Sequence, residues 1–311
     1  MILAFIIIGA LLVAVFLGAY YAFRVAFFVP EPRSGDYHLL PSGEQYDHHR
    51  EHLKNCIDKL YAMPFEKVEV RSYDGKKLFG RYYHVADGAP VQIQFHGYRG
   101  SAMRDLCGGA PLAFKLGHNV LLVDQRAHGS SEGSTISFGV RERKDCQRWC
   151  QYARERFGDQ TQLVLVGVSM GAATVLMASD MELPETVRAV VADCPYSSPR
   201  EIICRVAADA GLPAKPCGVF CSLGALIYGR FRLGSVSAVE SVRKTRLPVL
   251  LLHGEDDRFV PCDMSRQIQE GCGDRVRLET FPKAAHGMCY MEDPKRYEAA
   301  VGGFLTEHLA S

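Results

Sequence analysis

The pentapeptide GVSMG at residues 167–171 constrains the fold of this chain more than any other feature. It stands between two largely apolar segments, residues 162–166 before it and residues 172–178 after it. The pattern is typical of a buried strand that turns sharply into a helix, with a serine hydroxyl at the apex. Glycine suits both ends of the pentapeptide, because a Cβ would clash where strand and helix meet. The sequence therefore predicts a nucleophile elbow with Ser169 at its apex.

A second pentapeptide, GSSEG at residues 129–133, matches the same G-x-S-x-G pattern. The residues QRAH at 125–128 separate it from the strand expected before it, and no apolar helical segment follows it directly. We interpret this second copy as a turn. The surrounding sequence thus selects Ser169 as the candidate nucleophile.

A serine hydroxyl becomes a strong nucleophile only when a base takes its proton and an acid orients that base. Downstream of Ser169, the apolar residues 247–252 predict a short strand, and a cluster of acidic residues follows it. Residues 275–281 alternate like a second strand and lead into a loop that contains His286. Acid and base candidates therefore follow the elbow in the order expected along the chain, each just past a strand.

The acidic cluster offers Glu255, Asp256 and Asp257 as the orienting acid. The alternative is that these carboxylates only cap a helix expected to begin near Cys262. Among the eleven histidines, His286 is favoured by its place after the last strand and by the small residues around it.

Other histidines have simpler explanations. We interpret His253, which lies in a His-Gly turn, as structural. His48, His49 and His52 lie in polar surroundings without a cysteine or carboxylate at ligand spacing, so a solvated helix is favoured over a metal site. We expect no metal and no cofactor.

An acyl-transfer site also needs N–H donors that stabilise the oxyanion. One donor is expected from the residue after the nucleophile, which is Met170. The second is expected from the loop after an early strand, and residues 91–95 predict such a strand before a glycine-rich loop. Tyr98 in this loop is the predicted second donor. The alternative is that the glycines only form a turn before a helix capped by Ser101.

These segments together resemble the α/β-hydrolase superfamily, and more narrowly bacterial members with an N-terminal hydrophobic segment, related to serine aminopeptidase-like and esterase-like groups. The segments that carry the resemblance are HGYRGS (residues 96–101), DQRAHGSSEG (124–133), GVSMG, HGEDDRFVP (253–261) and AAHG (284–287). They fall within residues 68–309. The first loop lacks the HGGG form of hormone-sensitive-lipase-like esterases, which argues against that branch.

The resemblance implies a Ser-Asp-His triad in which the aspartate of the HG-x-x-D-x-x-VP segment is the acid. That aspartate is Asp257 in this chain, so the implied triad is Ser169, Asp257 and His286. It also implies a serine hydrolase acting on a small-molecule acyl substrate, most readily an ester or thioester. Alternatives are a serine aminopeptidase-like peptidase or amidase, a cofactor-free haloperoxidase-like side activity, and a non-catalytic membrane-tethered binding protein. The superfamily hosts many chemistries, so the substrate does not follow from the fold.

The first 23 residues contain no charged side chain and are dominated by large apolar residues. As a helix they would span about 34 Å, enough to cross a bilayer core. A cleavable signal peptide is the alternative, but no basic residue precedes the apolar segment. The aromatic residues 20–23 resemble an interfacial belt. The sequence therefore predicts an uncleaved single-pass anchor.

The orientation of this anchor follows from charge. Arg24 and Arg33 flank its C-terminal side, which favours a cytoplasmic catalytic domain. All eleven cysteines lie beyond the anchor, and an odd number does not form a closed disulfide framework, which also favours the cytoplasm. A formal net charge of +1 without a basic cluster gives no sign of nucleic-acid binding.

The sequence as a whole predicts three parts: an anchor at residues 1–23, a linker and helical lead-in at 24–66, and a catalytic domain at 67–311. Within the lead-in, residues 44–61 predict a helix. Expected strands alternate with helical segments from residue 67 onward, which indicates an α/β-hydrolase fold: a mostly parallel, twisted sheet of about eight strands with helices on both faces. A long insertion at about 195–247 carries apolar segments that we expect to be partly exposed, namely residues 202–203, 219–220 and 223–228. It predicts a helical lid over the pocket, and the alternative is ordinary packing of two extra helices.

Overall fold

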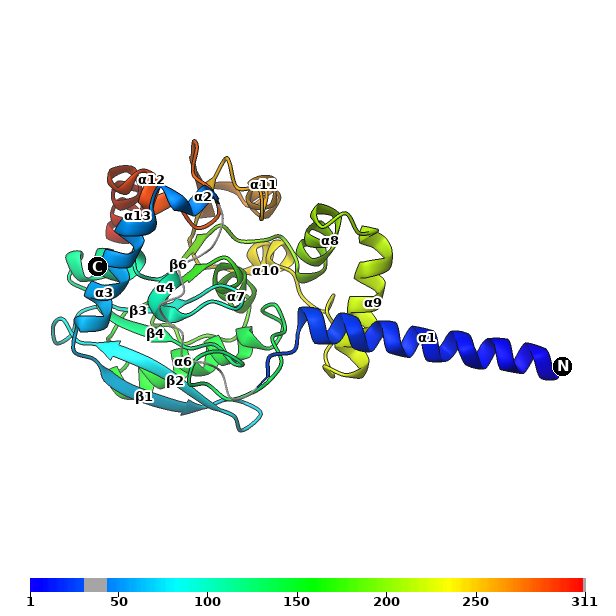
Figure 1. Cartoon of the computed structure of the whole chain (residues 1–311). Coiled ribbons are helices and arrows are strands. Elements are labelled where there is room, and N and C mark those ends of the chain that lie inside the picture. Colours follow the sequence, from blue (N-terminus) through cyan, green and yellow to red (C-terminus); the bar gives the residue numbers. More distant parts are fainter. Residues whose placement is uncertain (31–43, 310–311) are drawn as a thin grey trace.

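The computed structural model describes residues 1–30 and 44–309. An eight-stranded sheet forms its centre, in the order β1-β2-β4-β3-β5-β6-β7-β8 (Figure 1). The β1–β2 and β2–β4 pairs are antiparallel, and all other neighbouring strands are parallel. The strands are β1 (Glu66–Arg71), β2 (Lys77–Tyr83), β3 (Val91–Phe95), β4 (Asn119–Val123), β5 (Leu163–Val168), β6 (Val187–Asp193), β7 (Val249–Gly254) and β8 (Val276–Phe281). The predicted mostly parallel sheet of about eight strands is confirmed.

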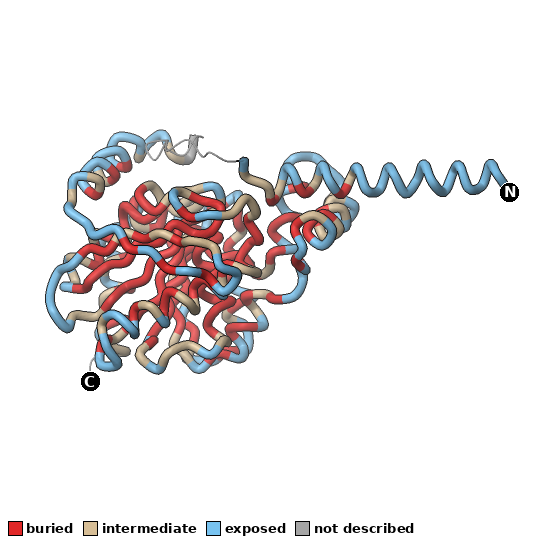
Figure 2. Tube along the Cα trace, turned by 90° about the horizontal axis from the view of Figure 1, so that it is seen from below, coloured by how far each residue is buried: buried red, intermediate tan, exposed pale blue. Residues whose placement is uncertain are grey.

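Helices cover both faces of the sheet, because side chains alternate along each strand and apolar residues occupy both sides. On one face, Ile93, Leu121 and Leu165 pack in a cluster with helices α6 (Glu142–Phe157) and α7 (Met170–Ala178). The opposite face is covered by further helices: α3 (Arg50–Ala62), α4 (Ala102–Asp105), α5 (Gly109–Lys115), α12 (Cys289–Glu292) and α13 (Pro294–Leu309). Figure 2 shows the buried trace concentrated in this layered body. Helix α11 (Asp263–Gln269) packs on β8, the last strand of the sheet.

The insertion after β6 folds into helices. They are α8 (Pro199–Asp209), α9 (Ala214–Ile227) and α10 (Ala238–Lys244). Pro199 lies at the first position of α8, and Ser198 caps the helix by accepting a hydrogen bond from Glu201 N at 3.2 Å. The sequence predicted apolar segments that would be partly exposed, but Ile202 and Ile203 of α8 are buried. They are buried because α8 turns them toward the body of the protein and α9.

The N-terminal helix α1 (Ile2–Ala26) packs against α9 with its last turns and projects away from the domain with the rest (Figure 1). Close packing depends on glycine, because a Cβ at Gly224 of α9 would lie 2.5 Å from the backbone oxygen of Ala19 on α1. Residues 2–17 are all exposed, as the pale trace of Figure 2 shows. This helix is long and apolar enough to cross a membrane by length and composition.

Two details differ from the predicted lead-in at residues 24–66. Helix α1 continues to Ala26, and the next residue, Phe27, is completely buried in the main hydrophobic cluster. The helix predicted at residues 44–61 is interrupted at His48 and His49, which separate α2 (Glu44–Asp47) from α3. Part of this region, residues 31–43, lies outside the described residues.

Candidate active site

Ser169 lies in the sharp turn between β5 and α7, at the centre of the sheet. Its backbone has φ 56° and ψ −115°, a strained conformation for a residue with a side chain. Ser169 N donates to the backbone oxygen of Asp193 on the neighbouring strand β6 at 2.8 Å, which helps to hold this conformation. A Cβ at Gly167 would overlap the Gly171 carbonyl, and one at Gly171 would overlap the Phe95 carbonyl. Both glycines of the pentapeptide are therefore required by close backbone packing, as the sequence predicted.

The structure brings Ser169, His286 and Asp257 together in one hydrogen-bonded line. The Ser169 hydroxyl lies 2.9 Å from His286 Nε2, and His286 Nδ1 lies 2.7 Å from Asp257 Oδ2. A carboxylate can only accept, so Nδ1–H donates to Asp257 and Nε2 is left to accept from the serine. His286 is thus oriented to take the serine proton.

Asp257 is held ionised by its surroundings. Burial alone would raise the pKa of its carboxyl group, but the facing charge of His286 and hydrogen bonds from His253, His286 and the Val260 N–H hold the pKa well below its usual range. The other carboxylate oxygen, Oδ1, accepts from Phe259 N at 3.0 Å and Val260 N at 2.8 Å. Glu255 and Asp256 are exposed by contrast. Of the acidic cluster, Asp257 is the carboxylate that meets His286.

His253 lies completely buried beside Asp257 and has partners on both ring nitrogens. Its Nε2 donates to the Val260 oxygen at 2.8 Å and lies 3.3 Å from Asp257 Oδ2, while Nδ1 lies 2.6 Å from the Ser265 hydroxyl. The ring therefore ties the loop of Asp257 to helix α11. This position fits the structural interpretation given to His253.

The loop after β3 passes directly beside the serine. A Cβ at Gly97 would lie 3.4 Å from the Cβ of Ser169, which places the following residue, Tyr98, next to the elbow. The N–H of Met170 lies at the start of α7, where the helix itself supplies no acceptor. The predicted donor Tyr98 therefore lies on a loop that adjoins Ser169, and the predicted donor Met170 is the first residue of α7, directly after Ser169.

Three side chains that the sequence analysis missed brace this loop. Asp105 accepts from Gly97 N at 2.9 Å, and its other oxygen accepts from Arg104 Nε at 2.6 Å. His96 Nδ1 lies 2.8 Å from the Gly97 oxygen, and His96 Nε2 accepts a hydrogen bond from Gln125 N. His128 Nε2 accepts from Arg99 N at 3.0 Å. Burial lowers the pKa of His96, which keeps the ring neutral and able to accept. In the sequence, His96 and His128 could have been recognised by their places in the HGYRGS and DQRAHG segments.

The same loop is attached to the end of α1. The Tyr98 hydroxyl donates to the Ala26 oxygen at 2.8 Å, and Arg99 Nη2 donates to the Val25 oxygen at 2.8 Å and the Phe28 oxygen at 3.3 Å. Carbonyls at a helix C-terminus have no partner within the helix, so they are ready acceptors. Nothing in the sequence pattern predicted this connection.

Two cavities meet at Ser169. One, of about 480 Å³, has mixed polar and apolar walls that include Tyr46, Arg104 and Asp105, and it also contains His286. The other, of about 570 Å³, has almost entirely apolar walls and extends between α1 and the insertion helices α8 and α9. The nucleophile candidate can therefore meet a substrate with one apolar and one more polar part.

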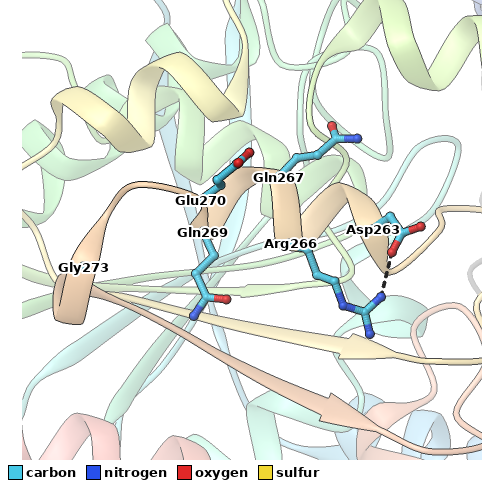
Figure 3. Close-up of a pocket in the computed structure, with 6 residues that line it drawn as sticks. All are labelled: Asp263, Arg266, Gln267, Gln269, Glu270 and Gly273. Atoms are coloured by element: carbon cyan, nitrogen blue, oxygen red, sulfur yellow. Dashed lines mark hydrogen bonds and ion pairs between the residues drawn. The ribbon is translucent and has the colours of Figure 1, made fainter.

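A further hollow, of about 760 Å³, lies along α11 and the turn after it. Its polar lining side chains project from one helix in several directions, and Asp263 is paired with Arg266 at 2.7 Å (Figure 3). It shares no lining residue with the cavities around Ser169. We assign it no part in the site.

Cys194, Asp257 and His286 form the group of described residues whose ligand atoms lie close enough to hold a metal ion. Burial raises the pKa of the Cys194 thiol well above its ordinary value. A protonated thiol is a poor ligand, because metal binding requires the thiolate. The histidine and the aspartate of this group are already engaged with Ser169 and with each other, and we assign no metal to it.

Asp193 is a second buried carboxylate at this edge of the sheet, which the sequence patterns did not identify as a site residue. It ends strand β6, and burial raises the pKa of its carboxyl group to about 6, despite the nearby charge of His253 and hydrogen bonds from Cys289 and Tyr297. In the sequence, Asp193 could have been recognised as an acidic residue at the end of a buried strand next to the elbow.

The chain belongs to the α/β-hydrolase family: the family model described as "Alpha/beta hydrolase family" matches residues 95–300. Among curated relatives, it is 27% identical over 247 residues to the uncharacterised protein YqkD of Bacillus subtilis, covering 78% of this chain and 81% of the relative. It is also 26% identical over 257 residues to the protein bem46 of Schizosaccharomyces pombe, covering 80% of this chain and 79% of that protein.

Solved structures with the same fold include the esterase Pf2001 of Pyrococcus furiosus. The superposition has a TM-score of 0.66 at 23% sequence identity and covers 81% of this chain and 94% of the esterase. The protein Est1E of Butyrivibrio proteoclasticus, solved with ferulic acid bound, gives a TM-score of 0.60 at 21% identity, covering 78% of this chain and 100% of Est1E. At these identities the likeness shows the fold alone. Family membership and fold place this chain among the hydrolases.

Proposed function

We propose that the protein is a serine hydrolase that acts by acyl transfer on ester or thioester substrates, with Ser169 as nucleophile, His286 as base and Asp257 as the acid that orients the base. The observation that carries this proposal is the line of hydrogen bonds from Ser169 through His286 to an ionised Asp257. The strained turn at Ser169 also supports it, because such conformations cluster at active sites.

The proposed reaction has two steps. Ser169 Oγ attacks the substrate carbonyl while His286 Nε2 takes the hydroxyl proton, and the N–H groups of Tyr98 and Met170 hold the developing oxyanion. When the C–O or C–S bond of the substrate breaks, the alcohol or thiol leaves with the proton from His286. A water molecule then attacks the acyl-enzyme in the same way, which releases the carboxylic acid and restores the serine.

An alkoxide or thiolate is an easier leaving group than an amine anion, and for this reason we favour esters and thioesters over amides. Comparison of p-nitrophenyl esters with aminoacyl p-nitroanilides, at matched concentration, tests this choice directly. Faster turnover of the anilides would instead support the aminoacyl peptidase alternative.

Labelling with a fluorophosphonate tests the nucleophile. The wild-type protein is expected to be labelled, and Ser169→Ala is expected to lose both labelling and about 10³-fold or more of its esterase turnover. Ser130→Ala is the matched control, because Ser130 is an exposed serine in the second G-x-S-x-G segment. Labelling that persists in Ser169→Ala, or disappears in Ser130→Ala, would contradict the proposal.

We further propose that residues 1–23 are retained as a membrane anchor and that the domain faces the cytoplasm. Helix α1 supports the first part, because its C-terminal turns pack on α9 and its end is bonded to the loop of Tyr98. Mass spectrometry of the protein from an alkaline-washed membrane fraction should find the intact N-terminus. Protease added to sealed, right-side-out vesicles should leave the domain intact. A processed N-terminus, or digestion from outside, would refute the corresponding part.

A further inference from the structure

The apolar cavity at Ser169 is built jointly by the membrane-anchor candidate and the insertion helices. Helix α1 contributes Gly18, Tyr21, Ala22 and Val25 to its wall. Helices α8 and α9 complete the wall with largely apolar residues, which include Ile202, Ile203, Val206, Phe220 and Cys221. The guanidinium of Arg99, which also borders the cavity, is bound to the Val25 and Phe28 carbonyls. The cavity is therefore suited to a hydrocarbon chain.

The length of α1 indicates where the cavity lies relative to the bilayer. A hydrocarbon core about 30 Å thick takes about 20 helical residues at 1.5 Å each. If Ile2 lies near one boundary of that core, Tyr21 lies near the other, and Arg24 lies just outside with the aromatic pair at residues 20 and 21. Gly18 and Tyr21, which line the cavity, then lie at the inner boundary of the bilayer.

The insertion helices expose apolar side chains beside the same part of α1. Val206, Leu212, Val219, Leu226 and Ile227 are between 38% and 54% exposed. Single exposed apolar residues are ordinary on a protein surface, but four of these belong to α8 or α9 and the fifth, Leu212, lies between the two helices. Helix α9 packs on α1. Such a surface is stable when it lies in the headgroup and acyl boundary of a membrane.

We propose that this cavity binds the acyl chain of a membrane lipid or a lipid-modified molecule, and that the chain enters from the bilayer between α1 and the α8–α9 pair. The inference rests on the proposed serine hydrolase function and names its substrate class: long-chain acyl esters or thioesters already inserted in the membrane. The acyl carbonyl reaches Ser169 at the inner end of the cavity, and the leaving group occupies the cavity that contains Tyr46, Arg104 and Asp105.

Helices α1 and α9 pack closely along the cavity wall. A Cβ at Gly18 would lie 2.8 Å from the Phe220 ring, which stands in the wall of the cavity. One helical turn further on, Ala22 is half-buried and also faces the cavity. A larger side chain at Ala22 should therefore fill the space that the acyl chain needs, without touching the Ser169–His286–Asp257 line.

The test compares Ala22→Phe with Ala14→Phe in protein reconstituted into phosphatidylcholine nanodiscs. Ala14 lies on the exposed, projecting part of α1 and is the matched control. We expect Ala22→Phe to lower kcat/KM for p-nitrophenyl dodecanoate at least about tenfold, because the filled cavity excludes the chain. The same variant should hydrolyse p-nitrophenyl acetate within about twofold of wild type, since an acetyl group needs no such space. Ala14→Phe should match wild type on both esters.

A second variant, Val206→Trp, fills the cavity from the opposite wall, and it applies if Ala22→Phe does not fold. The rate of modification of Ser169 by the small reagent diisopropyl fluorophosphate reports an intact site in each variant. Equal loss on both esters, or full activity on the dodecanoate, would overturn the acyl-chain site. If the full-length wild type hydrolyses the dodecanoate no faster in nanodiscs, where the ester is inserted in the bilayer, than in detergent micelles, entry from the bilayer is refuted. If wild type hydrolyses neither ester and Ser169 is not labelled, the proposed function itself fails.

Discussion

Replacing Phe27 by alanine is expected to destabilise the domain by about 3–5 kcal/mol, the range for removing a completely buried phenylalanine side chain. Phe27 directly follows α1 and is 0% exposed. Its ring meets the rings of Phe138 and Phe231 edge to face, with centroids 5.7 Å and 5.4 Å apart. The loss includes these two aromatic contacts, each worth about 0.5–1.5 kcal/mol beyond burial.

Thermal unfolding followed by tryptophan fluorescence measures the effect. The chain has one tryptophan, Trp149, which is buried in the same hydrophobic cluster as Phe27. For a domain of this size, 1 kcal/mol corresponds to about 2–4 °C, so Tm should fall by about 6–20 °C. Phe16→Ala is the matched control, because Phe16 is 49% exposed on the projecting part of α1 and its removal should leave Tm unchanged in the same detergent.

A double-mutant cycle with Phe138→Ala isolates the ring contact. The two substitutions should be non-additive by about 0.5–1.5 kcal/mol. Phe138 also stacks on Tyr98, with centroids 4.9 Å apart, so loss of Phe27 should loosen the proposed oxyanion loop and lower turnover at temperatures where the domain is still folded. A Tm within about 2 °C of wild type would refute the claim that the segment after α1 belongs to the core.

Two buried carboxylates give further predictions. Asp145→Ala should destabilise the domain by about 1.5–3 kcal/mol in the same fluorescence assay, because the buried Arg126 guanidinium loses its two hydrogen bonds to Asp145 and keeps only its pair with the partly exposed Asp74. A loss no larger than in an exposed-pair control, Asp263→Ala, would contradict this. Asp193→Asn should instead stabilise the domain at high pH. The pKa of Asp193 is raised to about 6 from 3.8, so the folded state binds its proton more tightly and stability falls as pH rises between these values. Above pH of about 6 the penalty is up to about 3 kcal/mol, so the variant should melt higher than wild type at pH 8 and equally at pH 4, whereas equal melting at pH 8 would refute it.

The sheet and the elbow could be predicted because their signals are local. Strand β3 has the predicted bounds, 91–95, and β5 (163–168) covers most of the apolar segment 162–166 and runs into the elbow, since short apolar segments between polar turns leave little choice. Parallel strands place their carboxyl ends on one edge of the sheet, so residues that follow β5, β7 and β8 were expected to meet. Ser169, Asp257 and His286 do lie within hydrogen-bond distance, and their catalytic roles remain predictions.

The side chains that support the loops around Ser169 could not be predicted, because their contacts form between residues far apart in the sequence. Asp105 is one of many aspartates until the fold places it against Gly97 N, and Asp193 is unusual only because the end of β6 is buried. The exposure of the insertion was misjudged at Ile202 and Ile203 for a related reason. An apolar segment does not reveal whether another helix will cover it, and here α8 turns both residues toward the cavity and the body of the protein.

The connection between α1 and the site leaves no sequence signal, because it is made through backbone carbonyls that any residue supplies. The acceptors for Tyr98 and Arg99 are the oxygens of Val25, Ala26 and Phe28. A chain that only needed tethering could have used a loose linker directly after its apolar helix. Here the residue after the helix is buried in the core, so the helix axis and the loop beside Ser169 are fixed relative to each other. A membrane that sets the tilt of α1 therefore also sets the direction in which the apolar cavity opens.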